Sequence, residues 1–127
     1  MTADIRNAAA LPHYTGEHTI PGIEFAAAGA AMGITAWGMN VLRFAPGTAG
    51  YPRHDHVADG QEELYVVLSG TLLLSVDDAE YPMGPGDMVR LGPETVRHFR
   101  TADSPAVLLV IGNAPGKAYD PNRAPGG

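Results

Sequence analysis

The sequence predicts an all-β protein of one domain, built as an antiparallel sandwich or barrel. Sixteen glycines and eleven prolines fall between short runs of β-branched, aromatic and leucine residues, a rhythm of brief strands separated by turns. Ser69-Gly70 and Asp77-Asp78 each separate two such runs, and short Gly or Asp pairs between strands are hairpin signals. Repeated hairpins favour a barrel or sandwich, because closure leaves few exposed strand edges.

The expected strands can be placed along the chain. They cover residues 34–44, 62–68, 71–76, 88–91, 96–101 and 106–111, with weaker candidates near His18 and Ile23. With 127 residues, 45% of them hydrophobic, the chain is long enough for one core and too short for two. We therefore expect a single domain over 1–127 with its barrel core at about 34–111, and with 1–16 and 115–127 extended or partly disordered.

The composition narrows the partners and the chemistry. Acidic residues outnumber basic ones by 14 to 8, and the formal net charge of −6 argues against nucleic acid or an anionic membrane as a partner. No run approaches the ~18 apolar residues of a membrane helix, and residues 1–14 lack the apolar stretch of a signal peptide, so a cytoplasmic location is expected. Because the chain has no cysteine, a metal would have to be held by His and carboxylate.

One segment concentrates metal-ligating residue types. His54 and His56 are two positions apart, so on an extended chain both imidazoles point to the same side. Glu63 follows seven residues after His56, and alternation along its strand gives it the same face as Gln61 and Tyr65. Two imidazoles and one carboxylate form a facial ligand set for divalent first-row metals that leaves coordination positions open. The alternative is a solvated His pair on a polar loop, with Glu63 as a surface charge.

These residues resemble the first motif of the cupin superfamily, which contains His-x-His, then Glu, then six residues and Gly. Glu63 and Gly70 keep the last spacing, whereas six residues rather than three or four separate His56 from Glu63. The resemblance spans roughly residues 34–111 and implies a jelly-roll β-barrel and a divalent metal ion (Fe, Mn, Ni or Zn). It also implies a homodimer, to which an apolar outer face with Leu64, Val66 and Leu68 could contribute.

The second cupin motif resembles the segment from Gly86 to His98, which in the family ends on a metal-binding His. Matching the family's proline to Pro93 puts His98 at the ligand position, whereas keeping the spacing from Gly86 puts Arg97 there. Adjacent strand residues point to opposite faces, so only one of the two enters the barrel. We favour His98 as the fourth ligand; Arg97 inside would instead bind a substrate carboxylate through its guanidinium fork.

Two functions follow from the resemblance. The first is a metal-dependent enzyme of dioxygenase or isomerase type acting on a small organic molecule, with Arg97, Tyr65 and Gln61 as candidate substrate contacts. The second is a non-catalytic module that binds a small molecule, with a degenerate or structural metal site. The fold does not choose between them, because one scaffold supports many chemistries.

Overall fold

The computed structural model describes residues 2–121, and most of its regular structure is β-strand. The described strands are β1 (Ile23–Ala26), β2 (Gly38–Phe44), β3 (Glu62–Ser69), β4 (Leu72–Val76), β5 (Ala79–Met83), β6 (Met88–Leu91), β7 (Arg97–Arg100) and β8 (Ala106–Asn113). A short 3-10 helix (Ala8–Ala10) and the five-residue α1 (Ala28–Met32) precede β2. The all-β, antiparallel prediction is confirmed, although α1 was not expected.

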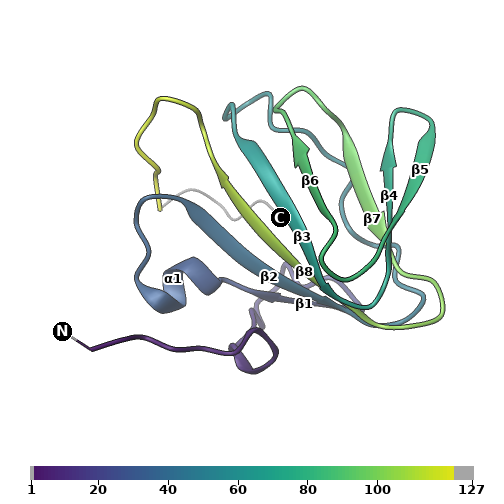
Figure 1. Ribbon diagram of the computed structural model, residues 1–127, viewed down its shortest axis with the longest axis horizontal. Helices are drawn as coiled ribbons and strands as arrows, with labels where there is room; N and C mark the ends of the chain where they lie inside the picture. The colour runs from purple at the N-terminus through teal and green to yellow at the C-terminus, as the bar shows by residue number, and fades with distance from the viewer. Residues whose placement is uncertain (1, 122–127) are drawn as a thin grey trace.

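The strands form two antiparallel sheets that face each other (Figure 1). One sheet has the order β1-β2-β8-β3-β6 and the other the order β5-β4-β7. This arrangement agrees with the jelly-roll prediction but corrects the expectation of full closure, because no single hydrogen-bonded ring joins the two sheets within residues 2–121. An isolated antiparallel bridge between His54 and Arg97 links the loop after β2 to β7.

Alternation along the strands separates a buried face from an outer face. In β8 every second residue is buried, and β3 alternates in the same way from Glu63 to Val67. Apolar side chains from both sheets meet in one core, where burial of apolar area supplies the main folding free energy. That core contains Ile23, Leu42, Phe44, Tyr51, Tyr65, Val67, Leu72, Leu74, Met83, Leu91, Phe99, Ala106, Leu108 and Val110.

Of the two expected hairpin signals, Asp77-Asp78 is confirmed, because it joins β4 to β5, which pair antiparallel. Ser69-Gly70 is a turn but not a hairpin: it leads from β3 in one sheet to β4 in the other, so that expectation is corrected. Asp77, between β4 and β5, has a φ of 47°, a left-handed conformation that Asp tolerates better than most residues. Gly70, between β3 and β4, has a φ of 72°, and a Cβ there would lie 2.0 Å from the carbonyl oxygen of Pro105. Glycine at position 70 is therefore required both by its backbone conformation and by the neighbouring loop.

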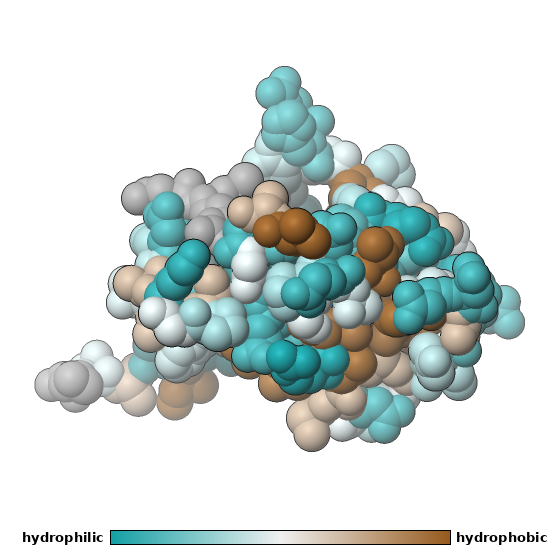
Figure 2. All heavy atoms as spheres, turned by 90° about the horizontal axis from the view of Figure 1, so that it is seen from above, coloured by the Kyte–Doolittle hydropathy of each residue, from teal (hydrophilic) through white to brown (hydrophobic). Residues whose placement is uncertain are grey.

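The segment before β1 packs across part of the outer face of the larger sheet. Leu11 is buried there with Ala26, Ala28 and Val41. Other residues of 2–16 are mostly exposed and carry only the short 3-10 helix. The expectation for 115–127 falls partly on 122–127, which lie outside the described residues. Seen from above, hydrophobic residues appear in separate patches among hydrophilic ones (Figure 2).

No helix within residues 2–121 has the length and apolar character that crossing a membrane requires.

Candidate metal centre

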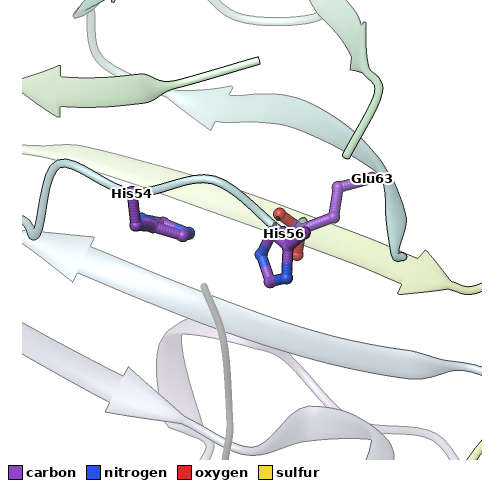
Figure 3. A group of neighbouring side chains, drawn as sticks. All are labelled: His54, His56 and Glu63. Carbon is purple, nitrogen blue, oxygen red and sulfur yellow. Dashed lines mark ion pairs between the residues drawn. The ribbon is translucent and has the colours of Figure 1, made fainter. Parts of the chain in front are cut away.

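The loop between β2 and β3 carries both candidate histidines, and backbone hydrogen bonds fix it against β7. The Arg97 N–H donates to the His54 carbonyl over 2.9 Å, and the His54 N–H donates back over 3.2 Å. The His56 N–H donates to the Pro93 carbonyl at 2.9 Å. These bonds hold the two imidazoles beside Glu63 of β3, as Figure 3 shows.

The Nδ1 atom of each imidazole has an acceptor, which determines the tautomer. His54 Nδ1 lies 2.8 Å from the Pro52 carbonyl oxygen, and His56 Nδ1 lies 3.0 and 3.1 Å from the two Asp59 carboxylate oxygens. A carbonyl or carboxylate can only accept, so in each neutral ring Nδ1 carries the proton and Nε2 carries the lone pair. Both Nε2 atoms are buried and have no hydrogen-bond partner among the described residues.

Glu63 faces these two nitrogens from an almost completely buried position, 1% exposed. Its Oε1 is 2.9 Å from His56 Nε2, although the two atoms are not aligned as a hydrogen bond. Ligand atoms of His54, His56 and Glu63 all lie within 4.8 Å of one another. The Tyr65 hydroxyl donates to Glu63 Oε1 at 2.6 Å and thereby holds the carboxylate in place.

Glycine at position 112 makes room for the Glu63 side chain. Gly112 pairs directly with Glu63 across β3 and β8. A Cβ at this position would lie 3.0 Å from Glu63 Cγ and 3.0 Å from Gln61 Oε1, closer than most real Cβ contacts. The side chains of Glu63 and Gln61 therefore pack directly against the backbone of Gly112.

Burial and neighbouring charges shift the pKa values of His56 and Tyr65. The Glu63 carboxylate, with a further contribution from Asp59, raises the pKa of the His56 imidazole above its ordinary value, while burial acts in the opposite direction. Burial raises the pKa of Tyr65 far above that of a free phenol, so its hydroxyl remains a donor to Glu63.

Arg97, and not His98, occupies the interior position of the second motif. Arg97 is 0% exposed, and its Nη1 lies 3.6 Å from Glu63 Oε1. His98 lies on the opposite face of β7, where its Nε2 contacts the Ala49 carbonyl oxygen at 3.0 Å. The expectation that His98 faces the interior is corrected, because the bridge that pairs Arg97 with His54 sets the register of β7 and so turns Arg97 inward.

The structure brings together six of the seven residues singled out from the sequence. Gln61 and Tyr65 are both buried on the face of Glu63, with Tyr65 in the core and Gln61 beside the Glu63 side chain. A pocket reaches Glu63 and Gln61 from the end of the barrel near α1, between Trp37, Asn40 and Tyr119.

Sequence reasoning missed Asp59, which orients His56. It stands in the Ala58-Asp59-Gly60 stretch that lengthens the spacing between the first-motif ligands. The available signal was that an acidic residue three positions after a candidate ligand can reach its ring.

The donor set of this centre fits a divalent cation. Two imidazole nitrogens, His54 Nε2 and His56 Nε2, converge with the Glu63 carboxylate, and the three ligand atoms lie within 4.8 Å of one another. A proton on His56 can pair with Glu63 across 2.9 Å, and a divalent cation could replace that proton. Acceptors brought this close repel one another unless a cation lies between them, and each imidazole already has the outer partner that metal-bound histidines use. A further open coordination position would remain for a substrate.

Comparisons with known proteins identify a family with this fold. Residues 40–112 match the family model described as "Cupin domain". No curated protein sequence matches the chain.

Three solved structures illustrate the similarity. A sugar phosphate isomerase of the cupin superfamily from Silicibacter pomeroyi is 28% identical, with a TM-score of 0.74 over 87% of this chain and 75% of that one. A DMSP lyase from Ruegeria pomeroyi is 26% identical, with a TM-score of 0.56 over 66% of this chain and 41% of that one. A cupin protein from Bacteroides fragilis is 24% identical, with a TM-score of 0.63 over 85% and 89%, and supports the fold alone.

Proposed function

Since this chain belongs to the cupin family, we propose that it is a metal-dependent enzyme acting on a small organic molecule, with His54, His56 and Glu63 as the ligands. The observation that carries the proposal is the pair of buried Nε2 atoms that face Glu63 and have no hydrogen-bond partner in the part of the chain that the structure describes. A bound Fe, Mn, Ni or Zn ion would polarise a substrate oxygen or activate water there.

Each protein group has a defined task around that ion. Pro52 and Asp59 keep the two imidazoles in the tautomer that offers Nε2. Tyr65 donates to Glu63 and fixes its orientation. Gln61 lines the pocket through which a small molecule would approach, and the apolar core beneath excludes water.

Isomerase chemistry is the first reaction class to test, because the sugar phosphate isomerase above is 28% identical over most of the chain. Dioxygenase chemistry is the second, because a facial set of two His and one carboxylate is typical of non-haem iron oxygenases. Metal-loaded protein would be assayed for aldose–ketose interconversion of sugar phosphates and for oxygen uptake.

The experiment that tests the metal centre compares the parent with the double variant His54→Ala, His56→Ala. Divalent-metal binding should disappear in the variant, since a three-ligand site cannot lose two of its ligands. The circular-dichroism spectrum should remain that of a β protein, because core packing does not depend on these rings. The control His13→Ala, on an exposed histidine, should bind metal as the parent does. Unchanged metal affinity in the double variant would contradict the proposal.

A non-catalytic binding module is the second candidate. The interior Arg97, where the family's second motif has a metal-binding His, favours it. Metal-free protein as isolated, with retained affinity for a small molecule, would support this reading over the first.

We propose in addition that two copies associate through the outer face of the larger sheet. Leu64 and Val66 are half-buried there, and Leu68 is 42% exposed. They adjoin Met88, 67% exposed, and Ile111 in the strand register. Light scattering of the parent and of Val66→Glu at micromolar concentration tests this: the parent should be a dimer and the variant a monomer, whereas a monomeric parent would contradict it.

The cytoplasmic location stays a prediction.

A further inference from the structure

Arg97 has hydrogen-bonding capacity that the protein leaves unused. Its side chain is 0% exposed, and its Nη2 donates to the Gly92 carbonyl oxygen at 2.9 Å. Its Nε and Nη1 are buried, and nothing within residues 2–121 accepts a hydrogen bond from them. The nearest carboxylate oxygen to Nη1, Glu63 Oε1, is 3.6 Å away, beyond hydrogen-bond distance. Buried donors without partners are costly, so a retained one indicates a ligand that satisfies it.

The charges around the centre indicate the sign of that ligand. With a divalent ion in place, the buried charges would be those of the ion and Arg97, opposed by Glu63. Asp59, whose side chain is 23% exposed, contacts the His56 ring and adds a second negative charge beside the centre. The centre would then keep about one net positive charge in a low-dielectric interior, where an unbalanced charge is unfavourable. A singly charged anion balances it.

Access and shape favour a small planar anion. The pocket beside Gln61 is lined by Glu63 but not by Arg97, whose Nη1 lies 3.6 Å from Glu63 Oε1, so only a small anion could span from the pocket to the guanidinium. Its other polar side chains include the amides of Asn40 and Gln61, which carry no charge. With His56 neutral as a metal ligand, Arg97 is the cation that remains paired with Glu63 among residues 2–121, and guanidinium groups match carboxylates in geometry.

From these observations we infer that the substrate of this centre is a small organic carboxylate, whose oxygen binds the metal while Arg97 donates to the carboxylate. This inference rests on the proposed metal centre and adds the class of substrate. Arg97 acts as a binding residue, in the position where a fourth metal ligand would otherwise lie.

The test measures anion binding, independent of turnover, in zinc-loaded protein by titration calorimetry. Zinc is titrated first; acetate, the neutral isostere acetamide and methyl phosphate are then titrated separately at saturating zinc. Acetate should bind at least roughly tenfold more tightly than acetamide, and Arg97→Met should lower acetate affinity by roughly tenfold or more, the loss of one charge-assisted hydrogen bond. Arg100→Met, an outward arginine of the same strand paired with Glu80, removes the same charge at the surface and should bind acetate as the parent does.

Each result decides the inference. Equal affinity for acetate and acetamide, or unchanged acetate binding in Arg97→Met, would overturn it while leaving the metal centre intact. Methyl phosphate binding more than tenfold tighter than acetate, with the same dependence on Arg97, would overturn the carboxylate assignment. If Arg97→Met does not fold, Arg97→Lys decides: it keeps the charge but loses the planar fork, and undiminished acetate binding in it would overturn the role of Arg97. If the parent binds no zinc in the first titration, the proposed function and this inference fail together.

Discussion

Replacing Asp59 by Asn tests the orientation of His56 with a minimal change in shape. The Asp59 carboxylate accepts from His56 Nδ1 at 3.0 and 3.1 Å, and its Oδ1 also accepts from the Gln61 backbone N–H at 3.0 Å. In Asp59→Asn the oxygen at the Oδ2 position becomes an NH₂ group that cannot accept, while the oxygen at the Oδ1 position can still accept from both His56 Nδ1 and the Gln61 N–H. The variant also loses the negative charge that makes the ring more basic.

The magnitude follows from the role of this partner. Loss of an outer partner to a ligating His commonly lowers metal affinity by about 10- to 100-fold, which corresponds to about 1.4–2.7 kcal/mol of binding free energy. Because the remaining amide oxygen can accept from both the Gln61 N–H and His56 Nδ1, the loop should keep its fold and the ring should keep one acceptor. The variant loses the second contact and the negative charge, so the expected loss lies at the lower end of this range.

The assay is a competition titration of zinc between the protein and a chromophoric chelator at fixed pH and ionic strength. The matched control is Asp55→Asn, since Asp55 lies on the same loop and its Oδ1 accepts from the Val57 backbone N–H instead of a ring nitrogen. Parent affinity in Asp59→Asn, or an equal loss in both variants, would refute the reasoning, because the effect would then be one of general charge.

Three further changes test the packing around the site. Gly112→Ala should lower zinc affinity by at least about tenfold, because the new Cβ displaces the Glu63 side chain. The control Gly84→Ala, whose new Cβ would have its nearest contact at 4.0 Å, should bind zinc as the parent does. Equal zinc affinities in the two variants would refute the role of Gly112 in making room for Glu63. Burial raises the pKa of Tyr51 and Tyr65, so from about pH 10 upward the unfolded chain loses phenolic protons that the folded chain keeps. The free energy of unfolding, measured in urea, should therefore fall as the pH rises above this value. Ionisation of all five tyrosines in the folded protein near pH 10 would contradict this. Leu108→Ala, at a fully buried core position, should cost about 2–5 kcal/mol of unfolding free energy in urea titrations, and a cost below about 1 kcal/mol would be inconsistent with the core described.

Local pattern was enough to predict most of the larger sheet. The expected 88–91 strand coincides with β6, and the expected 62–68 strand differs from β3 by one residue. These segments alternate strongly because one face lies in the core. The start of β2 was placed four residues early, at 34 instead of Gly38, because the α1–β2 connection contains apolar residues that alternation cannot tell from strand. α1 was missed because a five-residue helix of Ala, Gly and Met has no amphipathic period.

The first-motif group was predictable because its spacing is local, whereas the second motif depended on long-range register. Whether Arg97 or His98 faces inward is set by the pairing of Arg97 with Val76 on β4 and with His54 on the loop. A shift of one residue exchanges the two faces of a strand, and no feature of the segment itself fixes that shift. The family's loop lengths gave two alignments that differed by this one residue.

The inward orientation of Arg97 changes what the centre can recognise. A histidine in that position would add a neutral fourth ligand and leave the divalent ion opposed by Glu63 alone, with room for fewer open coordination positions. Arg97 adds a fixed positive charge and N–H donors 3.6 Å from Glu63 while contributing no lone pair. A bound ion would thus keep an extra coordination position, and the site would favour an anion at that position. In the proposed metal centre, the same one-residue choice of register would therefore set both the coordination number of the metal and the charge of its ligand.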